Sequence, residues 1–536
     1  MQQTHQQNKD SQMCTVIAIG PRASVDGSTL LSHSDSGQDS RVRKIPAQDH
    51  TPGAMAPVHW GLQNIVKPEL DHFGEVIGEI AQVPHTFAYF HSAYSHLNEH
   101  QLAIAESTTS QRPELKCARG EGEQIMTVEQ AMVFALQRCR HAREAVLLVG
   151  ELMERHGFLS SCGDGSELLC IADPDEVWVV EIVGVGPGWR ANSGAPGAIW
   201  AARRMEDDHA LIVANWSILR ELDLGDSERY LACAHVQSYA IERGWFRPEA
   251  GRPFDWQQAY IPLPHEWATS RLWLFYADVA PKLRPWPVRR LEGDRYATLD
   301  AYHQIVEPLD IYPFSVAPER KLGLGDVMAF HRSTFEGTIY DITEQPQWQV
   351  ADASGHVAKS SLATPFPNPD LRRLLRLTHR RPVARHFGHL SVICQLRRGL
   401  PADIAAVYWL ALDNPHVSSW IPMHVGIDAL HPCFSEYDPE QFSATSARWC
   451  IDFVDNLMQL AYQKALPFLL ARRAQFEAEL MAGWQALDLR LQHEPSEAER
   501  RASATAFAQV SMASVPVFYT ALRDLLITQL THKRQG

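Results

Sequence analysis

A cysteine stands at the head of the first segment that can form regular structure. Cys14 opens the run CTVIAIGPRASVDGSTLLSHSD, in which two apolar stretches, 15–19 and 29–32, flank a turn rich in Gly and Pro. Short stretches rich in Val, Ile and Thr that are separated by such turn residues predict two strands of a hairpin. The pattern therefore places Cys14 directly before a strand.

The position of Cys14 permits a particular chemistry. If the peptide bond after Met13 is cut, one residue carries both a nucleophilic sulfur and an α-amino group. That amine titrates near pH 8, about two units below a lysine, so it can accept the thiol proton at neutral pH. The alternative is a buried cysteine in a first strand that serves packing alone.

The order of the predicted elements is strands, then helices, then strands again. A further strand is predicted at 101–105, and a helical pair at 127–156 has Thr127 as a capping residue and Gly157 as its end. More strands are predicted at 168–172, 177–182, 198–201, 211–214, 389–395 and 405–412, and long helices at 465–491 and 502–531. This order predicts an α+β fold in which helices cover stacked sheets.

Several blocks of the chain resemble one family of enzymes. They are the initial CT with its DGST turn, NEHQLAIAEST, IADPDEVWVVEIVGVGPGW, ARRMEDD, VANWSI, PFSVAPERKL, DVMAFHRSTFEGTIYD, CQLRRGLPADI and FSATSARW. In this order they resemble the dipeptidase and secernin family of N-terminal-nucleophile cysteine peptidases. The resemblance implies a four-layer αββα sandwich and hydrolysis of dipeptides through a thioester on the cysteine.

The resemblance also suggests a division of the chain. Residues 1–13 are expected to be a leader or propeptide, or an over-extended start before Met13. Residues 14–435 are expected to form the catalytic domain, with a loop-rich insertion around 244–300 that is rich in Trp, Pro and Arg. Residues 436–536 are expected to form a mainly helical C-terminal region.

Four residues besides Cys14 are candidates for the site. Asp35 follows the second strand of the hairpin, and its carboxylate is expected to orient the α-amino group. Asn98 and Asn215 lie beside strands, and related amidases imply that such asparagines donate to the oxyanion. Arg41 is a candidate for binding a substrate carboxylate, and the only support is that it lies close in sequence to the predicted hairpin. For each asparagine the alternative is a local turn role.

Composition limits the partners. The chain has 63 acidic and 49 basic residues, a net charge of −14, which argues against binding to a nucleic-acid backbone. Nine cysteines without a CxxC pair favour a reducing cytoplasm, and no stretch is expected to cross a membrane. His96 and His100 have a spacing that suits a metal on a helix, but their segment is predicted to enter a strand, so no metal and no cofactor are expected.

These observations predict a cysteine dipeptidase that acts on small peptides and forms a homo-oligomer. One alternative is an amidase of the same chemistry that acts on N-acyl compounds. Another is a non-catalytic, secernin-like interaction protein.

Overall fold

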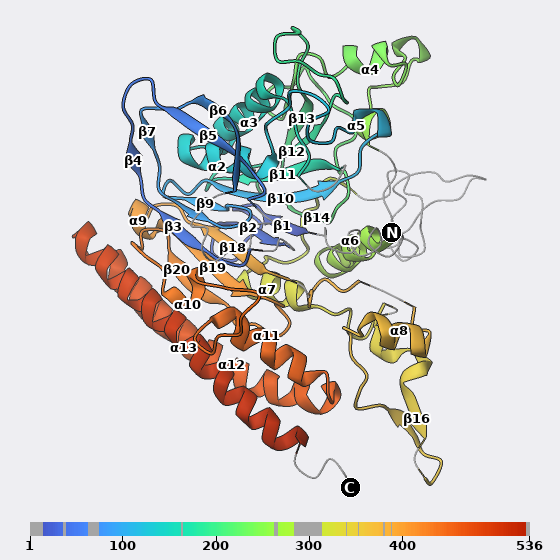
Figure 1. Cartoon of the computed structure of the whole chain (residues 1–536), viewed down its shortest axis with the longest axis vertical. Helices are drawn as coiled ribbons and strands as arrows, with labels where there is room; N and C mark the ends of the chain where they lie inside the picture. The colour runs from blue at the N-terminus through green and yellow to red at the C-terminus, as the bar shows by residue number, and fades with distance from the viewer. Residues whose placement is uncertain are drawn as a thin grey trace.

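Two antiparallel sheets form the centre of the protein (Figure 1). The computed structural model describes residues 14–35, 39–62, 74–161, 165–261, 266–283, 313–338, 340–351, 353–378, 381–386 and 388–531. The predicted leader 1–13 and parts of the predicted insertion 244–300 lie outside these residues.

The first sheet contains the predicted hairpin. Its six strands lie in the order β14 (Ala210–Val213), β1 (Thr15–Ile19), β2 (Thr29–Ser34), β18 (Leu390–Leu396), β19 (Ala406–Leu412) and β20 (Ile421–His424). Every pairing between these neighbours is antiparallel. All residues of the six strands are buried. Most of these strands have the largely apolar sequences that burial on both faces favours, whereas β2, TLLSHS, also buries polar side chains.

The second sheet has eight strands and three small sheets accompany it. Its order is β15 (Tyr230–Ala232), β13 (Ile199–Arg204), β12 (Val177–Val183), β11 (Ser166–Ala172), β10 (Ala103–Thr109), β9 (Leu97–Asn98), β8 (Tyr89–His91) and β3 (Arg43–Ile45). The two-stranded sheets pair β4 (Gln48–Asp49) with β7 (His85–Thr86), β5 (Met55–Trp60) with β6 (Glu75–Ala81), and β16 (Gln349–Ala351) with β17 (Val357–Lys359).

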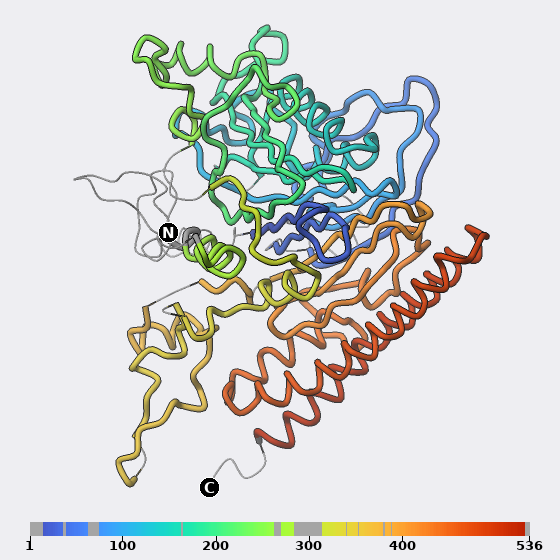
Figure 2. Tube along the Cα trace, turned by 180° about the vertical axis from the view of Figure 1, so that it is seen from behind, coloured from blue at the N-terminus to red at the C-terminus, as the bar shows by residue number. Residues whose placement is uncertain are grey.

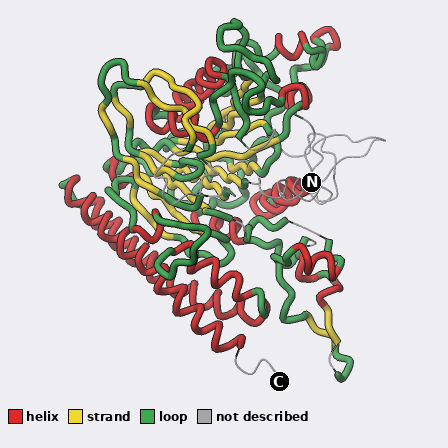
Figure 3. Tube along the Cα trace, in the orientation of Figure 1, coloured by secondary structure: helices red, strands yellow, loops and turns green. Residues whose placement is uncertain are grey.

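Helices lie outside the sheets, as the red and yellow segments of Figure 3 show. They are α2 (Val128–Arg138), α3 (Ala142–His156), α4 (Ser238–Glu242), α5 (Trp256–Tyr260), α6 (Glu266–Val279), α7 (Leu324–Arg332), α8 (Pro369–Leu375), α9 (Ala402–Ala405), α10 (Pro432–Ser435), α11 (Ala447–Met458), α12 (Tyr462–Gln492) and α13 (Glu497–Thr531).

The packing contacts show how these elements are arranged. Strand β10 of the second sheet contacts β1 and β2 of the first, so the two sheets meet where the hairpin lies. Helices α2 and α3 pack on the second sheet, whereas α11, α12 and α13 pack on β19 and β20 of the first. In the view from behind, α12 and α13 run along the outside of the first sheet (Figure 2). The fold is therefore α+β, with antiparallel sheets and a helical C-terminal part.

Most predicted elements are confirmed, and their differences have local causes. The strand predicted at 101–105 begins at Ala103 instead, because Gln101 takes a left-handed conformation with φ 64°. It then continues through polar residues to Thr109. The side chain of Thr127 accepts from the amide of Gln130, and Gly157 ends α3 at φ 73°, as the sequence predicts.

From the sequence, no stretch is expected to be long and apolar enough to cross a membrane, but helix α13 meets both criteria. Residues 497–530 of α13 include an 18-residue window of mean hydropathy 1.3, long and apolar enough to cross a membrane. The core helix of a soluble protein passes the same test, so one such helix is weak evidence. A line of its side chains, among them Met512, Tyr519 and Leu526, is buried against the rest of the protein.

A buried ion pair fixes α12 to the first sheet. Asp488 on α12 accepts from Arg397 at 2.7 and 2.9 Å and lies 2.8 Å from His424 Nε2 at the end of β20. Although burial raises the pKa of Asp488, the hydrogen bonds from His424 and Arg397 hold that pKa well below its usual range.

We expect Asp488→Asn to lower the free energy of unfolding by about 3 kcal/mol at pH 7, because it leaves Arg397, whose side chain is 12% exposed, without its charge partner. Since the folded-state pKa of Asp488 is lowered, its contribution is present above the unfolded pKa of about 4 and is lost as pH falls. The difference between the two proteins in urea denaturation should therefore shrink toward pH 3. Asp524→Asn, which removes an exposed partner of Arg523, is the control and should change little.

Candidate active site

Cys14 lies at the head of β1, between two neighbouring strands, and is 3% exposed. Thr15 pairs with Ser34 on β2, so the next position of that ladder brings Asp35 opposite Cys14. On the other side Val16 pairs with Val213, the last residue of β14, and Asn215 follows two residues later. Asn215 lies near Cys14, because Arg271 donates both to Cys14 O and to Asn215 Oδ1. The structure thus brings together three of the five predicted site residues at one end of the sheet.

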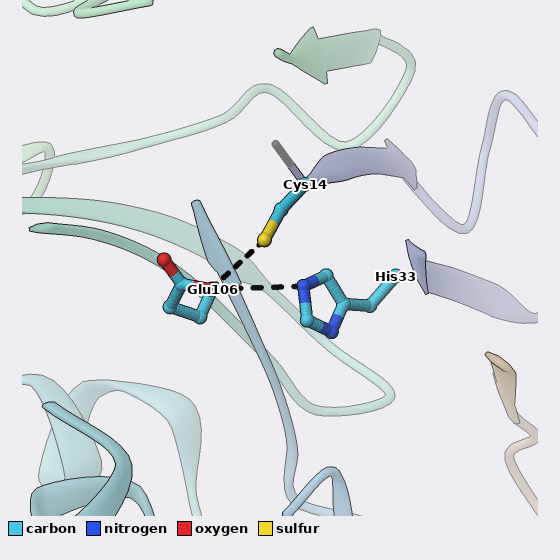
Figure 4. Close-up of side chains that lie close together, drawn as sticks. All are labelled: Cys14, His33 and Glu106. Atoms are coloured by element: carbon cyan, nitrogen blue, oxygen red, sulfur yellow. Dashed lines mark hydrogen bonds and ion pairs between the residues drawn. The ribbon is translucent and has the colours of Figure 1, made fainter. Parts of the chain in front are cut away.

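The thiol of Cys14 contacts a carboxyl group of the other sheet. Its Sγ donates to Glu106 Oε2 at 3.2 Å (Figure 4). Thr108 donates to Oε1 of the same carboxyl group at 3.0 Å. Burial raises the pKa of Glu106, although hydrogen bonds with Glu167, Cys14 and Thr108 lower it in part. The thiol therefore lies at the interface of the two sheets.

A chain of buried imidazoles leads away from Glu106. His33 Nε2 lies 3.8 Å from Glu106 Oε2, and His33 Nδ1 lies 2.8 Å from His96 Nε2. His96 Nδ1 is in turn 3.2 Å from the hydroxyl of Tyr408. Burial lowers the pKa of His96 to about 3, and burial with the neighbouring His96 and His331 lowers the pKa of His33. Both rings are therefore neutral near pH 7.

The guanidinium of Arg271, on α6, fixes the main chain beside the thiol. Its Nη1 donates to Cys14 O at 2.6 Å and to Thr15 Oγ1 at 2.8 Å. Its Nη2 donates to Ala214 O at 2.8 Å and to Asn215 Oδ1 at 3.0 Å. Burial lowers the pKa of Arg271 to about 9, with a further contribution from Arg385. Even so, the group is charged at neutral pH.

The amide of Asn215 is oriented by its neighbours. Because Oδ1 accepts from Arg271, the Nδ2 group points the other way and donates to Thr108 O at 2.7 Å. One hydrogen of Nδ2 is left without an acceptor among the described residues. The backbone of Asn215 is left-handed, with φ 58°, a conformation that asparagine tolerates better than most residues.

Asn98 has a different environment. Its Nδ2 donates to Leu136 O at 2.8 Å and to Cys139 O at 2.9 Å, so both hydrogens are used. Its Oδ1 accepts from the amides of His100 and Leu102, each at 3.0 Å. These four bonds join a turn to the end of α2. They favour a structural role for Asn98, and the predicted oxyanion role has no available N–H here.

Arg41 is paired within its own segment. Its guanidinium and Asp39 form a fork with contacts of 2.7 and 3.0 Å from Nε. Two other arginines, Arg381 and Arg385, are buried. Arg381 lies close enough to Cys14 and Arg271 for their charges to interact, and Arg385 lies close enough to Arg271 and Arg381. Arg41 stays a prediction as the carboxylate-binding residue, whereas Arg381 and Arg385 are candidates that the sequence did not reveal.

Sequence reasoning also missed Glu106, His33 and Arg271. Glu106 and His33 stand inside the motifs NEHQLAIAEST and LLSHSD, so their closeness to the predicted residues was a usable signal. Nothing marks Arg271, which lies 257 positions from Cys14 in the predicted insertion. His96 and His100 do not converge, since His100 Nδ1 lies 3.3 Å from Arg140 on the other side of the turn.

Comparison with known proteins places this chain in a family of peptidases. The sequence model of Peptidase family C69 matches residues 87–472, which is 386 of the 536 residues. The chain therefore belongs to peptidase family C69. The match contains Glu106, Asn215 and Arg271 and begins after Cys14.

Relatives over most of the chain carry dipeptidase names. A probable dipeptidase B of Lactococcus lactis subsp. lactis (strain IL1403) is 23% identical over 463 residues, covering 82% of both chains. A probable dipeptidase of Salmonella dublin is 22% identical and covers 78% of this chain and 82% of its own. The dipeptidase of Bifidobacterium longum (strain NCC 2705) is 22% identical, with 84% and 78% covered.

We expect Asn98→Ala to destabilise the protein by about 2–4 kcal/mol, because four buried main-chain groups lose their partner. Thermal unfolding followed by circular dichroism measures the change. Below the unfolding transition, kcat per folded molecule should stay within a few-fold of the original. A large fall in kcat with normal stability would restore the oxyanion role for Asn98.

Proposed function

We propose that this protein is a cysteine dipeptidase of the N-terminal-nucleophile class. The observation that carries the proposal is the position of Cys14, at the head of β1 in a chain of peptidase family C69, with Asp35 and Asn215 just beyond the ends of the two strands that flank β1. The dipeptide preference rests on the names of the relatives. The finer αββα assignment is supported by the packing contacts, in which helices cover the second sheet, the second sheet contacts the first, and other helices cover the first.

The reaction begins with the thiol of Cys14. The α-amino group of the mature Cys14 takes the thiol proton, and the sulfur attacks the carbonyl carbon of the scissile peptide bond. Asp35 holds the resulting ammonium by charge attraction. The guanidinium of Arg271 attracts the thiolate of Cys14. Arg381 also interacts with Cys14, although burial and the charges of Arg271 and Arg385 lower the pKa of Arg381.

The oxyanion needs a donor that is in place before the reaction starts. Asn215 suits this role, because Arg271 and Thr108 hold its amide in one orientation while one N–H is left for a ligand. The ammonium of Cys14 then protonates the leaving amine as the C–N bond breaks. Water attacks the thioester, gives up its proton to the amine, and releases the second product with the thiol restored.

Maturation provides the first test. We expect the purified protein to lack residues 1–13 in intact-mass analysis and to hydrolyse dipeptides. If cleavage is autocatalytic, Cys14→Ala should keep the leader, because no side chain remains for the N-to-S acyl shift, and should be inactive. A chain started at Met13 should be active once the methionine is removed. Active protein that carries only the full-length chain would contradict an α-amino base.

Cys117→Ser is the matched control for that experiment, because Cys117 is buried but contacts only a neighbouring carbonyl among the described residues. It should mature and hydrolyse dipeptides normally. Alkylation that abolishes activity should map to Cys14. A panel that includes N-acyl amino acids distinguishes a dipeptidase from an amidase, and a mature protein with a blocked N-terminus would favour a non-catalytic interaction protein.

A second test concerns the oxyanion. We expect Asn215→Ala to lower kcat about 100-fold to 1,000-fold with little change in KM, because the donor acts mainly in the transition state. Asn215→Gly also removes the amide but relieves the left-handed backbone, so it should unfold at a higher temperature than the alanine variant and be equally slow. Near-normal kcat in the glycine variant would assign the oxyanion site to main-chain amides.

A further inference from the structure

Cys14 and two neighbouring side chains, His33 and Glu106, are positioned so that they could bind a metal ion together. Cys14 Sγ, His33 Nε2 and Glu106 Oε2 lie within 4.8 Å of one another, and all three side chains are buried (Figure 4). The sulfur is 3.2 Å from the carboxyl oxygen, and the ring nitrogen is 3.8 Å from the same oxygen. They come from β1, β2 and β10, so both sheets contribute.

These separations suit a tetrahedral zinc ion. Zinc binds thiolate sulfur at about 2.3 Å and imidazole nitrogen or carboxylate oxygen at about 2.0–2.2 Å. At tetrahedral angles such bonds place neighbouring ligand atoms about 3.3–3.7 Å apart. The two separations from Glu106 Oε2, 3.2 and 3.8 Å, bracket that range. The third pair, Cys14 Sγ and His33 Nε2, lies within 4.8 Å, so the side chains must close on the ion where that pair is wider than the range. Thiolate, imidazole and carboxylate are each groups that zinc binds in proteins.

The surroundings of His33 support this use. Its Nε2 is buried and has no hydrogen-bond partner among the described residues, although it faces the carboxyl group of Glu106. Its Nδ1 contacts His96, whose own Nδ1 is close to Tyr408. When the proton of His33 sits on Nδ1 and is donated to His96, the lone pair of Nε2 faces the site. Metal-bound histidines are held by such outer contacts in many proteins.

We propose that Cys14, His33 and Glu106 bind one zinc ion, which reversibly inhibits the enzyme by occupying the sulfur nucleophile. Binding exchanges the thiol proton for a zinc–sulfur bond, and the proton leaves to solvent. The α-amino group of mature Cys14 supplies the fourth ligand, because nitrogen and sulfur of one terminal cysteine close a five-membered chelate ring. The fourth ligand and the inhibition rest on the proposed function, whereas the three side-chain ligands do not.

The test uses the purified mature protein and zinc or cobalt ions alone. We expect one zinc ion per chain by competition with a chromophoric chelator, and a thiolate charge-transfer band with Co²⁺. Zinc should slow alkylation of Cys14, measured on its peptide by mass spectrometry. Dipeptide hydrolysis should fall with zinc and return with EDTA, because the metal is an inhibitor here and no cofactor.

Two ligand variants and one control make the test specific. His33→Asn and Glu106→Gln should each weaken zinc binding at least 10-fold, the latter with almost no change of shape. His141→Asn removes an exposed imidazole elsewhere and should bind zinc as before. Melting temperatures show whether each variant is folded. If either ligand variant does not fold, Glu106→Asp is measured in its place. Zinc affinity that is unchanged in both ligand variants, or alkylation of Cys14 that zinc does not slow, overturns the proposal.

The outcomes separate this proposal from the proposed function. If zinc protects Cys14 but the protein hydrolyses no peptide, the zinc site stands and the dipeptidase assignment fails. If dipeptides are hydrolysed and zinc neither binds nor protects, the zinc site alone fails.

Discussion

The geometry of the site depends on one buried cation. Arg271 is 0% exposed, and a guanidinium in such a place is costly unless its donors are satisfied. Four of its hydrogen bonds go to the ends of β1 and β14, where Cys14 and Asn215 lie. Because the planar guanidinium fixes the directions of its donors, it sets the nucleophile and the amide relative to each other. The two residues behave as one unit for this reason.

The second sheet completes that unit through polar contacts in its interface with the first. Ser107 Oγ accepts from the main-chain amide of Asn215, and Thr108 O accepts from its side chain. Glu106, on the same strand, accepts from the thiol. Three successive residues of β10 therefore bind the ends of β1 and β14. A shift of β10 by one residue would turn each side chain to the opposite face and dissolve the site.

The sequence predicts the local parts of this arrangement well and the distant parts poorly. Apolar runs and turn residues predict β1 and β2, and the hairpin register then places Asp35 beside Cys14. The contact of Cys14 with Glu106 spans 92 positions and that with Arg271 spans 257. Such contacts depend on how two sheets stack and where a long connection returns. Neither periodicity nor turn chemistry records this information, although the family motifs contain Glu106.

Asn98 and Asn215 show where residue type alone reaches its limit. Both are buried beside strands, and the sequence assigns both the same role. Asn98 has every donor and acceptor satisfied by the main chain, which is the stable arrangement for a buried amide. Asn215 keeps an N–H without an acceptor among the described residues and takes a left-handed backbone. Both features cost stability. A ligand oxygen at that N–H would recover part of the cost, so the contrast between the two amides favours Asn215 as the residue that meets the substrate.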